Sequence, residues 1–151
     1  MTANPLSLDN QLCFTIYSAS HAFTRAYRPL LADLGLTYPQ YLVMLVLWDR
    51  RHARVSEIGQ VLGLDSGTLS PLLKRLEKIG LIGRRRDTGD ERIVNIHLTA
   101  RGIAAEAGAR IVAERIGQAV GCPVDQFIRL RDELRALTAR LDASVAAIET
   151  A

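Results

Sequence analysis

The sequence has few of the features that mark membrane, secreted or multidomain proteins. Its longest unbroken apolar run, Tyr41 to Trp48, has eight residues, whereas a membrane-spanning helix needs about 20. The first twelve residues carry no basic patch followed by an apolar stretch, so we expect no secretory signal. The 151 residues match one domain, since domains run to roughly 100–200 residues. We therefore expect a single domain, 1–151, with no membrane partner.

Cysteine and aromatic residues are also scarce. The two cysteines, Cys13 and Cys122, are too few for the disulfide framework of a small secreted protein. We therefore expect a soluble cytoplasmic protein whose thiols are normally reduced. Aromatic residues make up only 5%, but 48% of the chain is apolar, which is enough for a real core.

The positive charge is concentrated in the middle of the chain. Residues 66–98 hold seven Lys and Arg against four Asp and Glu, whereas the segments before and after are each balanced, so this stretch holds the whole net charge of +3. A local basic surface on a balanced protein indicates a polyanion bound at one place. A basic loop in contact only with water is an equally good interpretation of charge alone.

The amino-terminal half predicts two helices. Apolar residues recur at steps of three and four between Leu8 and Leu34, and Gly35 ends that helix. Thr37, with Gln40 three residues later, predicts a capping box for a second helix. Because that helix is apolar nearly all round, we expect it to form the buried centre of the core.

The next segment predicts a helix-turn-helix. Ser56 can begin a short helix that ends at Leu62, and Ser66 can cap a second one over Gly67 to Ile79. A glycine-containing turn between two short helices is typical of this motif. Apolar side chains, among them Ile58, Val61 and Leu73, would pack the two helices together and leave the polar side chains outside.

A wing follows directly, because the apolar period changes from about four to two. The segments 81–85 and 93–98 read as strands, and Asp87 to Asp90 has the composition of a turn. We then expect a long helix capped by Thr99, a break at Gly121-Cys122-Pro123 and a last helix to about Ile148. The sequence thus predicts a mainly α protein with a small β-hairpin, a six-helix winged helix-turn-helix.

The last helix is long for so small a domain. Its apolar positions step by three and four, which suits packing against another helix. Dimerisation through this helix and packing within one chain are both compatible with that pattern.

The helix-turn-helix and the wing can bind double-stranded DNA. The major groove is about 12 Å wide and admits one helix, and an Arg at a hairpin tip can enter the narrow minor groove. The candidate contacts on the second helix are Ser66, Thr68, Ser70, Lys74 and Arg75. The candidate contacts on the wing are Arg84, Arg85, Arg86, Asp90 and Arg92. Asp90 shares a strand face with Arg92 in this prediction, so its carboxylate could orient the guanidinium instead of contacting DNA.

The order of elements, with Asp90-Glu91-Arg92 and then Leu98-Thr99-Ala100-Arg101-Gly102, resembles the MarR family of transcription regulators. The resemblance implies a homodimeric repressor that binds a pseudo-palindromic operator. It implies a winged helix-turn-helix over about 37–98 and dimerisation helices over about 7–34 and 100–150.

A narrower resemblance concerns the organic-hydroperoxide regulators of that family, the OhrR type. It rests on Leu8 to Phe14, Tyr27 to Leu31, Leu36 to Tyr41 and Leu64 to Leu69. In that group the cysteine matching Cys13 senses the peroxide, and tyrosines matching Tyr27 and Tyr38 hydrogen-bond it. The resemblance also implies that Cys122, commonly of the partner subunit, resolves the oxidised thiol as a disulfide.

The residues themselves agree in part with this resemblance. Cys13, Tyr17 and Tyr27 fall on one polar stripe of the first helix, and phenol O–H groups can donate to a thiolate and favour ionisation. A thiolate attacks a peroxide oxygen and becomes a sulfenic acid. The Gly-Pro setting of Cys122 predicts an exposed thiol. A buried apolar Cys13 and an incidental Cys122 are the plainer interpretations.

Three functions therefore compete. The first is a repressor released when organic hydroperoxides oxidise Cys13, and the second is a repressor released by a small aromatic acid in the dimer cleft. The third, a thiol peroxidase, is disfavoured because no Arg supports Cys13 within its helix. The three histidines have no metal-ligand spacing, so we expect neither a metal nor a cofactor.

Overall fold

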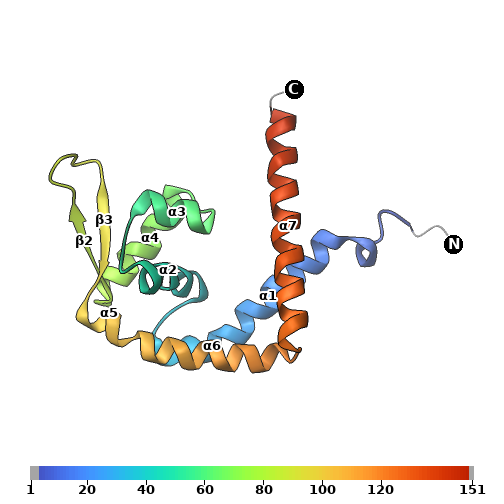
Figure 1. Cartoon of the computed structure of the whole chain (residues 1–151), viewed down its shortest axis with the longest axis horizontal. Coiled ribbons are helices and arrows are strands. Elements are labelled where there is room, and N and C mark those ends of the chain that lie inside the picture. The colour runs from blue at the N-terminus through green and yellow to red at the C-terminus, as the bar shows by residue number, and fades with distance from the viewer. Residues whose placement is uncertain (1–3, 150–151) are drawn as a thin grey trace. The chain divides into compact units, whose positions relative to one another are not determined.

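Seven α-helices and one small sheet make up residues 4–149, the part of the chain that the computed structural model describes (Figure 1). The helices are α1 (Leu12–Leu31), α2 (Tyr38–Arg50), α3 (Val55–Leu62), α4 (Ser66–Lys78), α5 (Ala100–Ala104), α6 (Glu106–Val120) and α7 (Val124–Glu149). Short 3₁₀ turns, η1 (Leu8–Asn10) and η2 (Ala32–Leu34), flank α1. One compact unit ends at Ile116 and a second begins at Gly117, so α7 is described by itself.

The predicted hairpin is present, but the sheet has three strands. β2 (Ile82–Arg86) pairs antiparallel with β3 (Val94–Leu98), and β1 (His52–Arg54) pairs with the other edge of β3. The sequence interpretation missed β1 because three residues are too few to show an alternating pattern. The mainly α winged helix-turn-helix class is confirmed, and the single helix expected over 100–120 is divided at Ala105 into α5 and α6.

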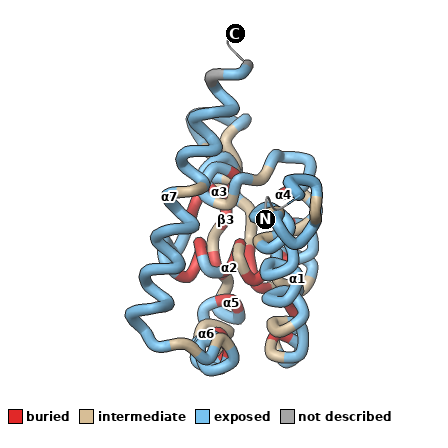
Figure 2. The backbone as a smooth tube through the Cα atoms, turned by 90° about the vertical axis from the view of Figure 1, so that its right-hand side faces the viewer, coloured by how far each residue is buried: buried red, intermediate tan, exposed pale blue. Residues whose placement is uncertain are grey.

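The core is built around α2, as its all-round apolar sequence predicts. Tyr41, Val43, Met44 and Leu47 are at most 2% exposed, and the buried leucines of α4 and Ile82 and Ile96 of the sheet belong to the same cluster. Figure 2 shows the buried positions gathered in α2 and the elements around it, whereas α7 is exposed over nearly its whole length. Val61, which we expected to pack between α3 and α4, is instead 50% exposed.

Polar residues begin α2 and α3, and the cap predicted for α3 is wrong. Thr37 and Gln40 form the expected capping box of α2, with the Thr37 N–H donating to Gln40 Oε1 at 2.9 Å. The short helix α3 begins at Val55 and not after Ser56, because the Arg54 N–H donates to Glu57 Oε2 at 2.7 Å. Glu57 three residues on is the acceptor that fixes this start.

The end of α4, the end of β3 and the start of α5 meet at one junction. Thr99 caps α5 by accepting from the Gly102 N–H at 3.0 Å, and its hydroxyl donates to Gly80 O at 2.6 Å. The Trp48 indole N–H donates to Gly102 O at 2.8 Å in the buried interior. A Cβ at position 102 would overlap the carbonyl oxygen of Leu81, so only glycine allows this close approach.

Apolar side chains remain exposed on α1 and α7 of a single chain. On α1, Leu12 is 61% and Phe23 40% exposed. On α7, the apolar residues Phe127, Leu130 and Leu134 are also exposed. By length and composition no single helix within residues 4–149 could cross a membrane. Only the pair Leu12–Leu34 and Tyr38–Arg50, bent by 67°, passes that test together, and its second helix is the buried α2.

We predict that Gly102→Ala destabilises the protein by about 2 kcal/mol or more, because the added methyl must displace the Leu81 backbone. Gly117→Ala is the matched control. A Cβ at position 117 of α6 meets nothing within 4 Å, so that change should raise stability by about 0.5–1 kcal/mol. Thermal unfolding at fixed protein concentration measures both, and equal midpoints for the two variants would contradict the prediction.

Candidate DNA interface and thiol site

The amino-terminal end of α4 is fixed by an acidic cap. Asp65 Oδ1 accepts from the Thr68 N–H at 2.7 Å, and this hydrogen bond is the main reason why the pKa of Asp65 is lowered. The cap is therefore Asp65, and the prediction of Ser66 is wrong. Both side chains can accept a hydrogen bond from the helix backbone, but the helix begins at Ser66, one residue earlier than predicted. Ser66 is the first helical residue and is exposed.

The predicted polar face of α4 points away from the core. Leu69, Leu73 and Leu76 are buried beneath it, with exposures of at most 1%. The candidate contacts Ser66, Thr68, Lys74 and Arg75 are exposed, and Ser70 is half-buried. The helix thus presents hydroxyls near its start and cations further on.

The wing tip is a turn held by two aspartates. Asp87 Oδ1 accepts from the Gly89 N–H at 2.9 Å and the Asp90 N–H at 3.3 Å, and these bonds hold the pKa of Asp87 below its usual value. Asp90 and Arg92 lie in this turn, so the shared strand face that we expected does not form. Asp90 Oδ1 instead accepts from the Arg92 N–H at 3.0 Å and lies 3.9 Å from its guanidinium Nε.

A groove of about 400 Å³ runs between α4 and the wing. Its polar lining comes from Arg54, Ser56, Ser66, Ser70, Arg84 and Arg92. Ser56 and Arg54 were not among the predicted contacts, because Arg54 reads in the sequence as part of a polar connection between helices. The groove brings three arginines and three hydroxyls to the side of the wing that faces α4.

Arg84 is placed in this groove by an acidic residue of α4. Its Nε lies 3.0 Å from Glu77 Oε2, although the alignment is too poor for a hydrogen bond. Within the described residues, Arg84 Nε and Nη2 are shielded from solvent and satisfied by no hydrogen bond. Because Nε already faces the Glu77 carboxylate, Nη2 is the donor that favours an anion in the groove, since shielded polar groups are normally hydrogen-bonded.

The three consecutive wing arginines do not share a surface. Arg84 and Arg86 alternate with Arg85 along β2, so Arg85 points to the opposite face, where it lines a second groove with Asn95. The structure therefore brings Arg84 and Arg92 together with Ser66 and Ser70, but it separates Arg85 from them.

This arrangement fits one strand of a DNA duplex. The major and minor grooves are separated by a sugar-phosphate strand, so a helix in the first and a wing in the second must hold that strand between them. The arginines and serines of the groove are the donors that commonly bind phosphate oxygens.

Cys13 lies exposed in the first turn of α1. Tyr17, one turn further on, is also exposed, and its ring lies 4.2 Å from the ring of His21. Tyr27 is fourteen residues from Cys13 on the same helix, which is about 21 Å at 1.5 Å per residue. Of the predicted thiol-supporting tyrosines, only Tyr17 is therefore near Cys13 within one chain.

Tyr27 belongs to an aromatic cluster between α1 and α2. Its ring centroid lies 4.7 Å from that of Tyr38 and 5.4 Å from that of Tyr41. Burial, with smaller contributions from Tyr41 and Tyr38, raises the pKa of Tyr27 to about 12, and burial also raises the pKa of Tyr38. Both phenols therefore keep their protons at neutral pH and can donate hydrogen bonds.

Cys122 lies in the break between α6 and α7, after Gly121 with its φ of +65°. Its thiol is free and half-buried, not exposed as the sequence suggested. Among the described residues, no group of three or more His, Cys, Asp or Glu is placed to hold a metal ion.

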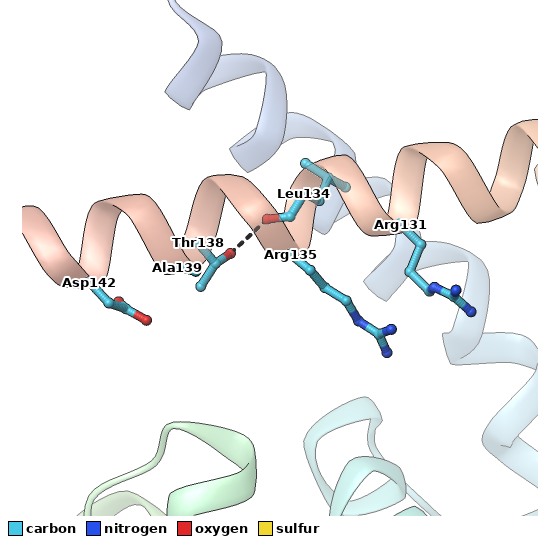
Figure 3. A pocket seen from close by; sticks show the side chains of 6 residues that line it. All are labelled: Arg131, Leu134, Arg135, Thr138, Ala139 and Asp142. Carbon is cyan, nitrogen blue, oxygen red and sulfur yellow. Dashed lines mark hydrogen bonds between the residues drawn. The ribbon is translucent and has the colours of Figure 1, made fainter.

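A shallow surface along α7 carries no binding site of its own. Figure 3 shows its lining residues, Arg131, Leu134, Arg135, Thr138, Ala139 and Asp142, all of which come from this one helix. Thr138 Oγ1 donates to Leu134 O at 3.0 Å, so the hydroxyl is satisfied within the helix. A surface made by one helix suits contact with another helix better than enclosure of a small molecule.

Comparison with known proteins supports this description. The family model for the transcriptional regulator SarA/Rot matches residues 25–106. The regulator TtmR of Methylorubrum extorquens is 49% identical over 97% of this chain and 75% of its own length. The organic hydroperoxide resistance transcriptional regulator of Bacillus subtilis is 52% identical over 64% of this chain and 66% of its own length.

Solved structures show the same architecture. AbfR in its reduced form bound to DNA has a TM-score of 0.74 and 38% identity, over 89% of this chain and 94% of AbfR. The disulfide-formed AbfR has a TM-score of 0.63 and 39% identity, over 87% and 92% of the two chains. AbfR is a protein of Staphylococcus epidermidis. MarR from E. coli in complex with operator DNA has a TM-score of 0.74 and 25% identity, over 83% of this chain and 92% of MarR. By its winged helix-turn-helix, its basic groove and these relatives, the chain belongs to the MarR family of DNA-binding transcription regulators.

Proposed function

We propose that this protein is a cytoplasmic, homodimeric repressor that releases its operator when an organic hydroperoxide oxidises Cys13. The observation that carries the proposal is the exposed Cys13 at the start of α1, in a chain 52% identical over 64% of its length to an organic hydroperoxide resistance regulator. Because the family consists of regulators, the thiol peroxidase hypothesis is set aside.

The distance along α1 supports a thiol site shared between two subunits. Tyr27 of the same chain is too far from Cys13 to donate to it. A two-fold axis that crosses two antiparallel copies of α1 near Ser20, midway between these residues, would bring Cys13 beside the partner subunit's Tyr27. The exposed Leu12 and Phe23 would then be covered by the partner.

The chemistry at this site has two steps. The Cys13 thiol reacts with a hydroperoxide, ROOH, so that its sulfur takes one oxygen to become a sulfenic acid and ROH leaves. The thiol of Cys122 from the partner subunit then attacks that sulfur and forms a disulfide, and water leaves. A disulfide requires Cα atoms about 4.4–6.8 Å apart, so its formation would move the dimerisation helices if the reduced thiols are farther apart.

DNA binding in this proposal uses the groove between α4 and the wing. In a two-fold dimer the two α4 helices would occupy major grooves about 34 Å apart, which matches a pseudo-palindromic operator. Oxidation that moves the subunits would change this spacing and release the DNA.

A second candidate signal is a small aromatic acid. A pocket of about 440 Å³ between α1 and the start of α2 is lined by Arg25, Arg28 and Tyr38, among others. Two guanidinium groups and an aromatic ring suit a carboxylate on an aromatic body. Such a ligand would release DNA without any change at Cys13.

We predict that Arg92→Ala weakens operator binding by about 1–3 kcal/mol without lowering stability. The Arg92 side chain is 95% exposed, and its only ion pair among the described residues is with Asp90, at 3.9 Å. Fluorescence anisotropy with an operator duplex selected from a random pool measures the affinity. Arg115→Ala, which removes an exposed charge from α6, is the control; equal affinities of the two variants would remove the wing tip from the interface.

We predict that cumene hydroperoxide releases the wild-type protein from this duplex and leaves Cys13→Ser bound, since a serine hydroxyl is not oxidised by the peroxide. Anisotropy is measured before and after addition, and mass spectrometry locates the added oxygen. Release of Cys13→Ser by peroxide would refute the thiol sensor. Release of both proteins by an aromatic acid such as salicylate, with no response to peroxide, would favour the second signal.

We predict that Cys122→Ser still responds to peroxide but loses the covalent dimer seen on a non-reducing gel. Its Cys13 would stop at the sulfenic acid or react with small thiols. Samples are alkylated before loading so that no disulfide forms during electrophoresis. A covalent dimer of unchanged intensity in this variant would exclude Cys122 as the resolving thiol.

A further inference from the structure

The face of the wing sheet opposite α4 carries a second polar groove. It has a volume of about 470 Å³, and its lining residues are Arg51, His52, Arg85, Asn95 and His97. All five side chains can donate hydrogen bonds, and four of them carry or can acquire a positive charge. The groove has no apolar lining side chain. The proposed operator interface does not use it.

Strand register brings these residues together. His52 of β1 lies directly opposite His97 of β3, and Arg85 of β2 lies directly opposite Asn95. Since side chains two apart on a strand share a face, Asn95 and His97 point the same way. Three strands therefore contribute donors to one surface.

Gly83 makes room for the imidazole of His97. It is the β2 partner of His97, and a Cβ at this position would lie 2.5 Å from His97 Nε2. Any other residue would push the ring away from the sheet. Gly83 thus lets the His97 ring pack closely over β2, next to the other residues that line the groove.

The end of α2 directs a guanidinium to the same place. Arg51 has a φ of +67°, and among the described residues it is the only non-glycine residue with a positive φ. Its Nη1 donates to Glu106 Oε2 at 2.9 Å, so the side chain is held next to the groove. Residues kept in a left-handed conformation are often found at functional sites.

The acidic groups near the groove are already occupied. Glu106 is bound by Arg51 and by Arg110, at 2.9 and 2.8 Å, and its pKa is lowered by these two guanidinium groups. Asp87 accepts hydrogen bonds from backbone N–H groups at the wing tip, and the Arg54 charge and the Asn95 side chain also lower its pKa. Within the described residues Arg85 has no ion-pair partner. The groove therefore keeps an excess of positive charge.

We infer that this groove binds a small phosphate-bearing anion, either inorganic phosphate or a phosphomonoester. A guanidinium fork matches two phosphate oxygens, and the imidazoles can donate to the remaining ones. The volume is suitable for a small ligand, and the polar lining disfavours an aromatic acid. The guanidinium groups disfavour a metal cation.

The site is separate from the groove that faces α4. Arg84 and Val94 line that groove, whereas Arg85 and Asn95, the next residues along the two strands, line this one. A phosphate-bearing ligand here and a DNA strand held between α4 and the wing would occupy opposite faces of the sheet. The inference therefore does not depend on the redox function proposed for Cys13.

The three histidines allow a direct test by NMR. His52 and His97 line the groove, whereas His21 lies on α1 against Tyr17 and serves as an internal reference. The imidazole C–H resonances are assigned with His→Gln variants and followed while sodium phosphate replaces sodium chloride at constant ionic strength. We expect the His52 and His97 signals to shift with a common saturating curve and His21 to stay unchanged. Three signals that move together, or a linear response, would overturn the inference.

Two variants test the role of the groove. Arg85→Gln should weaken phosphate binding by about tenfold, because a charge-assisted hydrogen-bonded pair is lost. Arg86→Gln removes the same charge from the other face of β2 and should leave phosphate affinity unchanged. Equal loss in both variants would indicate a general charge effect and would overturn the site. Thermal unfolding checks that both variants are folded.

Further titrations separate the sources of the anion. Glycerol phosphate is compared with inorganic phosphate, and tighter binding of the ester would support a phosphorylated small molecule while weaker binding would support the free ion. A short non-specific DNA duplex and tetra-aspartate are titrated in parallel. Saturable shifts of His52 and His97 with either of these, and none with phosphate, would assign the groove to DNA or to an acidic protein segment and overturn the inference.

Discussion

The junction of Trp48, Leu81 and Gly102 determines where the wing lies relative to α4. Gly102 approaches the Leu81 carbonyl so closely that no side chain fits, and the Trp48 indole anchors the Gly102 carbonyl at 2.8 Å. The Thr99 N–H donates to Leu81 O at 3.1 Å, so β3 ends against the same peptide. The groove lies between α4 and the wing, and both of these elements begin or end at this junction. The junction therefore determines the shape of the groove.

The same junction is in packing contact with the region of the proposed thiol sensor. Ring contacts lead from Tyr38 to Tyr27, from Tyr27 to Tyr41 and from Tyr41 to Trp48, with centroid separations of 4.7, 5.4 and 6.1 Å. These rings join α1 to the end of α2, where the Trp48 indole meets α5. A displacement of Tyr27 therefore acts on packed neighbours, and close-packed interiors transmit such displacements.

Much of this fold could be predicted from the sequence because its signals are local. Thr37 and Thr99 cap α2 and α5, as their positions in the sequence predict. The sequence of α2 is apolar on nearly all sides, which predicts that this helix is buried. The errors occur where two local signals compete or where the signal is short. Asp65 and Ser66 are adjacent and both can cap, and β1 has only three residues.

The site was less predictable because its residues meet only through tertiary structure. The exposed hydroxyls and cations of α4 follow from its amphipathic pattern. The pairing of Glu77 with Arg84 and the arrival of Arg54 in the groove do not, since they depend on how the wing packs on α4. The distance between Cys13 and Tyr27 can be calculated from the sequence, because both lie on one helix of known rise per residue. That distance indicates that Cys13 can contact Tyr27 only if the tyrosine comes from a second subunit.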